Sequence, residues 1–411
     1  MISIRLTTFT CLQIFTHEVL RIVYICKYVY SYLCIVKENI PLKKLQDWYA
    51  KNHERQLSGR YITAKMIAPL LEQLDGFCTL THVGNSVANR PIHTLQLGVG
   101  KTRVLMWSQM HGNESTTTKA IFDVLLAFQD EDLPSLKALL EQLTICIVPI
   151  LNPDGAHLYT RNNANDVDLN RDSQTQSQPE SVVLKELFER FNPDICFNLH
   201  GQRTIFGFED TGAPSVLSFL SPSADSDRSI TLSRKRSMSI ITSINDTFKE
   251  LLPKQIGRYD DGFNINCVGD TFQNKEVPTV LFEAGHTPND YEREICREYI
   301  FLSIISALKA SVTEEMYDTS RYFEIPEHQK CYCDILIKNT SSGDITIMYQ
   351  ECLKGDKVVF IPKLADNTIT KAFFGHRVIE AKGGEAKIVF KDKEDEMSDI
   401  VELTLNNERI L

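Results

Sequence analysis

The stretch VLMWSQMHGNE, residues 104–114, is an apolar run that changes abruptly into a polar turn. Val104–Ser108 has the composition of a buried strand, and a helical pattern over Ser115–Phe128 follows the turn. A second apolar, β-branched run, Thr144–Ile150, comes after this helix and is typical of a buried central strand. This order of strand, helix and strand predicts a largely parallel sheet whose connections are helices.

The same alternation continues on both sides of this unit. Further strands are expected at Phe77–Val83, Ile92–Leu97, Ile195–Leu199 and Val280–Phe282, and further helices at Leu42–Leu74, Leu136–Leu143, Glu180–Phe191, Thr231–Leu252 and Asp290–Ala310. Asn152–Ser177 is rich in Asn and Asp and is expected to be a loop. The fold class is therefore α/β, with a mixed, largely parallel central sheet and helices on both faces.

The pattern changes after about residue 325, where short strand-like runs alternate with Gly, Asp and Asn turns. Such runs are Cys333–Ile337, Ile345–Gln350, Lys357–Ile361 and Ala386–Phe390. We expect a small C-terminal all-β appendix. The expected organisation is an extension over residues 1–45, a catalytic domain over 46–320 and a small β-rich domain over 326–411.

The extension contains an apolar and aromatic run, Leu20–Val36, that includes the charges of Arg21 and Lys27. Two charges in so short a run argue against a membrane-spanning helix. No small-residue cleavage site follows it, which argues against a signal peptide. We interpret residues 1–45 as a non-native extension, with a membrane anchor as the alternative, and we expect no membrane contact.

The composition narrows the class of protein further. The 411 residues are 43% hydrophobic and carry a formal net charge of -10, so a nucleic-acid partner has no electrostatic support. The 11 cysteines show no spacing of a disulfide framework. Reduced, mostly buried thiols are expected, which favours a cytoplasmic location.

The polar residues of interest lie at the ends of predicted strands, where open α/β sheets bind ligands. His111 and Glu114 follow the strand Val104–Ser108, and His200 follows Ile195–Leu199. Two imidazoles and one carboxylate are the protein ligands expected of a catalytic zinc site, which keeps one position open for water. Each residue alone fits an ordinary structural position as well.

Two further segments carry charged groups at strand ends. The loop after Thr144–Ile150 contains Arg161 and the run Asp168-Leu169-Asn170-Arg171. Guanidinium groups and amides of this loop fit a carboxylate clamp, although a solvated polar loop has the same composition. Glu283 ends the strand Val280–Phe282, where a carboxylate close to a metal site fits a general base.

Taken together and in this order, these segments resemble the zinc metallocarboxypeptidase family over Thr102 to Ala310. The resemblance implies that His111, Glu114 and His200 bind one zinc ion per chain. It also implies roles for residues of the loop: Asp168 orients the first histidine, Arg161 polarises the scissile carbonyl, and Asn170 and Arg171 bind the terminal carboxylate of the substrate.

The resemblance further implies that Glu283 is the catalytic glutamate, which takes a proton from the attacking water and gives it to the leaving amine. Members of the family close a tyrosine over the substrate, and Tyr259 is near the place expected for it. Asp270 lies near the expected side-chain pocket and would favour basic side chains.

The implied function is a zinc-dependent hydrolase that removes C-terminal residues from peptides. Its partner is a peptide or small amide substrate with a free carboxylate. One alternative is a zinc-dependent deacylase or amidase of small N-acyl amino acids on the same scaffold. A second alternative, of another class, is a non-catalytic binding protein that keeps the fold.

Overall fold

The computed structural model describes residues 41–313, 316–365, 374–392 and 398–411. The apolar run Leu20–Val36, and with it the predictions made for the extension, lies outside the described residues. The first described helix, α2 (Leu42–Asn52), begins within the segment predicted as an extension. In the part of the chain that the structure describes, no helix combines the length and the apolar character needed to cross a membrane.

An eight-stranded sheet forms the centre of the molecule, in the order β1-β2-β4-β3-β5-β10-β8-β9. The four strands β4, β3, β5 and β10 run parallel to one another. Strand β2 pairs antiparallel with β1 and β4, and β8 pairs antiparallel with β10 but parallel with β9. The strands are β1 (Thr79–Asn85), β2 (Pro91–Leu97), β3 (Thr102–Ser108), β4 (Leu143–Val148), β5 (Ile195–Gly201), β8 (Leu217–Leu220), β9 (Ile256–Arg258) and β10 (Thr279–Ala284). This confirms the predicted mixed, largely parallel sheet.

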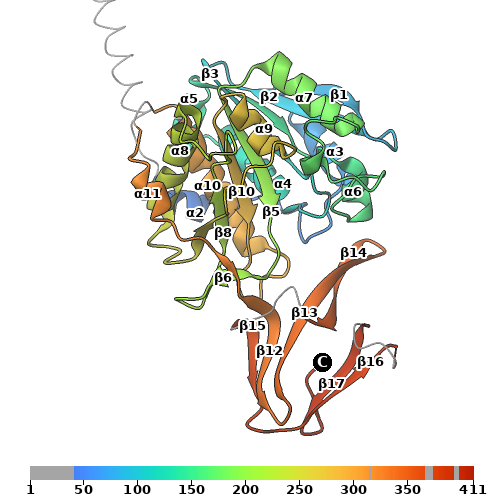
Figure 1. The fold of residues 1–411 in the computed structure, drawn as a ribbon. Helices are drawn as coiled ribbons and strands as arrows, with labels where there is room; N and C mark the ends of the chain where they lie inside the picture. The colour runs from blue at the N-terminus through green and yellow to red at the C-terminus, as the bar shows by residue number, and fades with distance from the viewer. Residues whose placement is uncertain (1–40, 314–315, 366–373, 393–397) are drawn as a thin grey trace, which may run out of the picture.

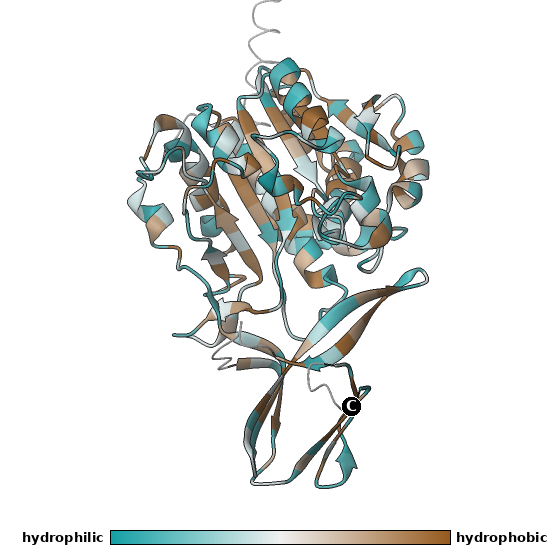
Figure 2. Ribbon diagram, turned by 45° about the vertical axis from the view of Figure 1, so that its right-hand side comes forward, coloured by the Kyte–Doolittle hydropathy of each residue, from teal (hydrophilic) through white to brown (hydrophobic). Residues whose placement is uncertain are grey.

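The central strands β4 and β5 are buried almost throughout, and Figure 2 shows that the residues of the central sheet are largely apolar. Alternate residues of β3 serve different cores: Val104 and Met106 belong to one hydrophobic cluster, and Leu105 and Trp107 belong to another. This alternation follows from the two-residue period of a strand. Helices therefore cover both faces, as predicted.

The larger core lies under the helices α2, α3 (Ala64–Gln73), α4 (Thr116–Gln129), α5 (Pro134–Leu139), α8 (Leu232–Phe248) and α10 (Glu294–Ser311). The helices α7 (Pro179–Phe191) and α9 (Val268–Asn274) cover the other core. The short helix α11 (Ser320–Phe323) precedes the C-terminal strands.

Three sequence-based boundaries were wrong. Leu42–Leu74 forms the two helices α2 and α3, and α5 ends at Leu139 because Leu143 already belongs to strand β4. The predicted loop Asn152–Ser177 contains α6 (Pro153–Leu158) and the 3₁₀ turn η1 (Leu169–Arg171). The side chain of Asn152 accepts a hydrogen bond from the Gly155 amide, and Pro153 occupies the first turn, so this turn sequence also starts a helix.

A separate β-rich region follows α11 and confirms the predicted C-terminal β appendix (Figure 1). Its four-stranded sheet has the order β14-β13-β12-β15, and a three-stranded sheet has the order β16-β17-β18. The strands are β12 (Tyr332–Thr340), β13 (Gly343–Lys354), β14 (Lys357–Leu364), β15 (Phe374–Glu380), β16 (Ala386–Phe390), β17 (Ile400–Leu405) and β18 (Glu408–Arg409). A small core of its own includes Ile335, Ile347 and Leu403. The domain boundaries given above stay a prediction.

A third small sheet joins this region to the rest of the molecule. Strand β11 (Gln329–Lys330) pairs with β6 (Phe206–Phe208), which also pairs with β7 (Ala213–Pro214). Because β6 follows β5 directly in the chain, the C-terminal region is attached just beyond one of the strands that ends at the candidate site.

Candidate active site

The metal-ligand candidates lie at the carboxyl ends of adjacent parallel strands. His111 follows β3, and His200 is the second-last residue of β5. Glu283 on β10 pairs in register with His200. Between the strands, Gly112 packs so closely that a Cβ atom there would lie 1.9 Å from the carbonyl carbon of Gly155. A glycine is therefore required for the turn that carries His111 and Glu114.

Three side chains converge on one point. The Nδ1 atoms of His111 and His200 are 3.0 Å apart, and each lies 2.9 Å from a different carboxylate oxygen of Glu114. Both imidazoles are only 2% exposed. Two ring nitrogens facing each other beside a carboxylate make a candidate donor set for a divalent cation, and His₂Glu suits zinc.

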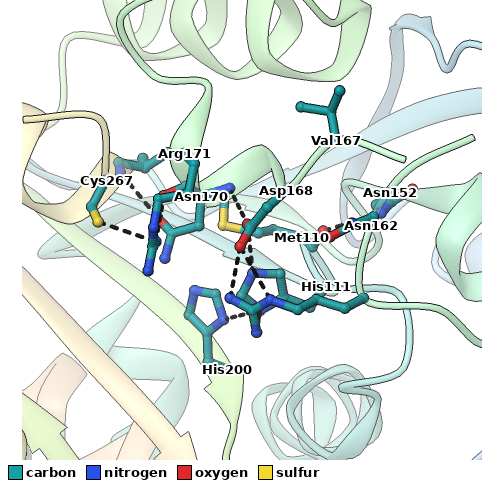
Figure 3. A network of polar contacts seen from close by, with 12 residues as sticks. Met110, His111, Asn152, Asn162, Val167, Asp168, Asn170, Arg171, His200 and Cys267 are labelled. Atoms are coloured by element: carbon teal, nitrogen blue, oxygen red, sulfur yellow. Dashed lines mark hydrogen bonds and ion pairs between the residues drawn. The ribbon is translucent and has the colours of Figure 1, made fainter. Parts of the chain in front are cut away.

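Asp168 supports this arrangement from behind the first histidine (Figure 3). Its Oδ1 lies 3.1 Å from Nε2 of His111 and accepts a 2.9 Å hydrogen bond from the Asn170 amide. Burial acts to raise the pKa of Asp168, but His111 and Arg161 outweigh it and hold the pKa below its usual range. An ionised carboxylate in this position fixes the imidazole so that Nδ1 faces the metal site.

Arg161 lies across the same group, with about half of its side chain exposed. Its Nη2 donates to Asp168 over 2.9 Å, and its Nη1 is 3.2 Å from Nδ1 of His111 and 3.5 Å from Glu114. A guanidinium held in this way beside the donor set can stabilise negative charge that develops on a bound carbonyl oxygen.

Asn170 and Arg171 follow Asp168 in the turn η1, and Arg171 lies beside Cys267 (Figure 3), the residue that precedes α9. The side-chain oxygen of Asn170 accepts a 3.0 Å hydrogen bond from the Val268 amide. Arg171 is exposed, and its Nη1 donates to the Asn170 carbonyl and to Sγ of Cys267. The structure thus brings this pair close to the metal-ligand candidates, with α9 as its neighbour.

Glu283 completes the group on the β10 side. Its Oε2 is buried and has no hydrogen-bond partner among the described residues. Burial raises the pKa of Glu283 well above its usual value, and the charge of Glu114 acts in the same direction. A carboxyl group with a raised pKa and a free oxygen is suited to accept and return a proton.

Tyr259 is placed differently from a tyrosine on an open loop. Its hydroxyl donates to Oε1 of Gln202 over 3.1 Å, and its ring packs against Phe206 and His328. Burial raises the pKa of Tyr259 well above its usual value, and the charges of Glu283 and Glu114 add to this. Tyr259 therefore lies beside the site, but a closing movement stays a prediction.

Asp270 lies on α9 and is 7% exposed. Its Oδ1 accepts a 3.2 Å hydrogen bond from the Asn264 amide. Burial raises its pKa to about 6. A contact with basic substrate side chains also stays a prediction.

Two neighbours of the site were not found from the sequence. Gln202 binds Tyr259, and the buried Arg293 donates to the carbonyls of Gln202 and Ala284. The only sequence signal for Gln202 is its position two residues after His200. Arg293 is 91 residues away from Gln202 and precedes α10, so no local pattern indicates it.

The comparisons with known proteins agree with this geometry. The zinc carboxypeptidase family matches residues 63–248. The chain resembles the zinc metallocarboxypeptidases. The matched residues include His111, Glu114 and His200, whereas Glu283 lies beyond them. The match supports the resemblance to this family of metallopeptidases, and the three metal-ligand candidates lie within it.

Individual relatives cover only parts of the chain. Carboxypeptidase 2 of Trichophyton rubrum is 33% identical over 100 residues, which are 24% of this chain and 18% of the relative. The gamma-D-glutamyl-L-diamino acid endopeptidase 1 of Lysinibacillus sphaericus is 27% identical over 33% of this chain and 48% of its own length. The chain thus spans about a fifth of the length of the first curated relatives it matches.

Among solved structures, a metallo-carboxypeptidase from Pseudomonas aeruginosa in complex with (2-guanidinoethylmercapto)succinic acid is 17% identical. The similarity covers 61% of this chain and 70% of that protein, with a TM-score of 0.49.

Proposed function

We propose that this protein is a zinc-dependent hydrolase that removes C-terminal residues from peptides. The observation that carries the proposal is the convergence of His111, Glu114 and His200 beside the buried, unpartnered oxygen of Glu283. We further propose one zinc ion per chain, held by the two Nδ1 atoms and the carboxylate. Bound in this way, zinc supplies Lewis acidity and makes a water molecule more acidic.

We assign the other steps of the reaction to side chains of the protein. Glu283 accepts a proton from the attacking water at its free Oε2 and later returns it to the leaving amine. Arg161 stabilises the negative charge that forms on the carbonyl oxygen. Its Nη1 is suitably placed for this, because it lies 3.2 Å from Nδ1 of His111. Asn170 and Arg171 bind the terminal carboxylate of the substrate, which selects the last amide bond.

Two other functions compete with this proposal. A deacylase of small N-acyl amino acids would use the same metal site and is expected to differ in the loop that clamps the substrate. The run Asp168-Leu169-Asn170-Arg171 favours a peptide or amino-acid carboxylate, which both kinds of substrate carry, so a comparison of substrates distinguishes the two functions. A non-catalytic binding protein would need none of the proton-transfer machinery, and the buried Oε2 of Glu283, which has no hydrogen-bond partner among the described residues, argues against it. The free thiols among the described cysteines support a cytoplasmic location as part of the proposal.

The decisive experiment measures zinc content and hydrolysis in the same preparation. We expect one zinc per chain, cleavage of peptides with a free C-terminus, and little cleavage of the amidated peptides. N-acyl amino acids form a third substrate arm, and their exclusive hydrolysis would favour the deacylase. Cleavage that is indifferent to amidation would contradict the carboxypeptidase proposal.

The matched test of the mechanism is Glu283→Gln. We expect kcat to fall by roughly 10²–10⁴-fold with zinc still bound, because the amide cannot carry the proton. Glu298→Gln is the control, since Glu298 is a half-buried glutamate on α10 whose pKa burial also raises. Full activity of Glu283→Gln with bound zinc would overturn the assignment.

A further inference from the structure

A cleft of about 450 Å³ opens beside the metal-ligand candidates, and two distant parts of the chain line it. One side consists of Glu114, Arg161 and residues 201–204 of the main body. The other side belongs to the sheet β14-β13-β12-β15, here called the C-terminal sheet, which contributes Tyr349 and Phe360. The candidate site is therefore bounded by the β-rich region as well as by the central sheet.

The position of the cleft relative to the carboxylate clamp indicates which part of a bound substrate occupies it. Asn170 and Arg171 are absent from the described residues that line it, whereas Glu114 and Arg161 are present. If the clamp holds the terminal carboxylate, the scissile carbonyl lies at Glu114 and Arg161. The part of the substrate on the acyl side of the bond then extends into this cleft.

The C-terminal sheet is fixed in place by buried polar contacts. The guanidinium group of Arg60 forms an ion pair with both carboxylate oxygens of Glu351 on β13, at 2.9 and 3.0 Å. Glu351 also accepts a 2.5 Å hydrogen bond from the Tyr159 hydroxyl. Asp334 on β12 accepts a 2.9 Å hydrogen bond from the Tyr291 hydroxyl. Burying these groups is favourable only in the docked arrangement, because each of them needs its partner.

Aromatic packing also joins the C-terminal sheet to the main body at the cleft. The rings of Tyr349 and Phe360 both pack against Tyr291 of the main body, with centroids 5.2 Å away in each case. His376 on β15 makes a further 2.8 Å contact to the carbonyl of Thr204, which lies on the opposite side of the cleft. The C-terminal sheet is thus tied to the two segments that flank the metal-ligand candidates.

We propose that the C-terminal sheet forms the acyl-side wall of the substrate site and limits it to short substrates, such as N-acyl amino acids, dipeptides and tripeptides. This inference rests on the proposed function, because the direction of the cleft depends on the clamp. A volume of about 450 Å³ is in the lower part of the range of small-molecule sites. A longer acyl part would have to pass the residues of β13 and β14 that line the cleft, Tyr349 and Phe360 among them.

The test uses peptides that share one C-terminal residue and carry an acyl part of one, two, four or six residues. Values of kcat/KM are measured with the zinc-loaded full chain. We expect the value to fall by at least about tenfold between the short and the long substrates, as for a pocket that excludes extra groups. The double variant Tyr349→Ala/Phe360→Ala should reduce this difference to less than about threefold.

Two variants guard against loss of folding as an explanation. Phe360→Leu keeps an apolar side chain and should give an intermediate preference for length. Val378→Ala is the control in the same sheet, because Val378 on β15 is 55% exposed and does not line the cleft. Thermal unfolding of each variant is recorded beside the kinetics. An equal kcat/KM for all peptide lengths in the wild type would contradict the proposal that the C-terminal sheet limits substrate length.

Binding separates this inference from the proposed function. Affinities of the same peptides are measured by calorimetry with zinc-loaded Glu283→Gln. A length-dependent affinity without any hydrolysis by the wild type would support the wall and overturn the proposed function. Hydrolysis by the wild type, together with affinities that do not depend on peptide length, would support the proposed function and contradict the inference about the C-terminal sheet.

Discussion

The carboxyl edge of the central sheet and the junction with the C-terminal sheet both border the same cleft, yet they are built differently. Strand β4 is buried along its whole length, and β5 is buried from Ile195 to His200. Strand β14 in the C-terminal sheet is mostly half-buried. The first region is held by a core on both faces of the sheet, whereas the second is attached through a few polar and aromatic contacts.

This difference determines how each region holds its functional groups. At the sheet edge, Glu283 and His200 are neighbours because their strands pair in register. At the junction, Arg60 and Glu351 meet across 291 residues of sequence. A site of the first kind follows from the strand order, whereas a contact of the second kind depends on how two separate regions dock.

The largest expected effect concerns the junction. Glu351→Ala leaves Arg60 buried without its carboxylate and removes the acceptor of the Tyr159 hydroxyl. We expect a loss of about 3 kcal/mol of unfolding free energy, because an uncompensated buried charge is costly. Chemical denaturation checks the loss, and limited proteolysis should show cleavage first in the C-terminal sheet.

Glu131→Ala is the control for this change, since the Glu131 side chain is 91% exposed and pairs with Lys137 at the surface. Its effect on stability should be close to zero. If Glu351→Ala were as harmless as this control, the junction would not depend on the buried pair, and the comparison of the two regions would fail.

The next effect concerns the sheet edge. Asp168→Asn replaces the carboxylate that faces Nε2 of His111 and binds Arg161. We expect zinc affinity to fall by roughly 10–100-fold, as for other groups that orient metal ligands. Competition with a chelator measures the affinity, and the unfolding midpoint without metal should change little. An unchanged affinity would show that His111 is oriented by its backbone alone.

The smallest expected effect is a pH dependence of the junction. Burial lowers the pKa of His376 to about 4, and the charge of Arg293 acts in the same direction, against the hydrogen bond to Thr204. The unfolded chain therefore binds more protons than the folded one between about pH 4 and 6.5, so stability falls as the pH falls through this window. We expect His376→Gln to remove about 1 kcal/mol of this loss near pH 6.

Unfolding curves of wild type and His376→Gln at several pH values check this. The stability that is lost between pH 8 and pH 6 should be smaller in His376→Gln than in the wild type by about this amount. Parallel pH profiles for the two proteins would mean that His376 titrates in the folded state as freely as in the unfolded state.

Much of the fold followed from local sequence patterns. Apolar β-branched runs and helical periodicity predicted the central strands and most helices, because burial on both faces of the sheet leaves a continuous apolar signature. The predicted boundaries of an element were wrong where one sequence signal is typical of two structures. Asn152-Pro153 indicates a turn and also the start of a helix, and it begins α6 here.

The candidate site was predictable to a similar degree. The positions of His111, His200 and Glu283 at strand ends predicted that they meet, because the ends of neighbouring parallel strands share one edge. Asp168 lies in a loop, and its place beside His111 was implied only by the family resemblance. The roles of these residues stay proposals until the experiments are done. The contact between Tyr259 and Gln202 was not predictable, since it joins a loop after β9 to the end of β5.

The sequence by itself determined an α/β fold, a β-rich C-terminal region and a set of zinc-ligand candidates, because these depend on periodicity and on the chemistry of single residues. Only the tertiary structure decided that the C-terminal sheet borders the cleft at Glu114 and Arg161. That placement depends on pairs such as Arg60 and Glu351, whose burial is favourable only when both partners are brought together. Such pairs have no periodicity, so no local pattern reveals them.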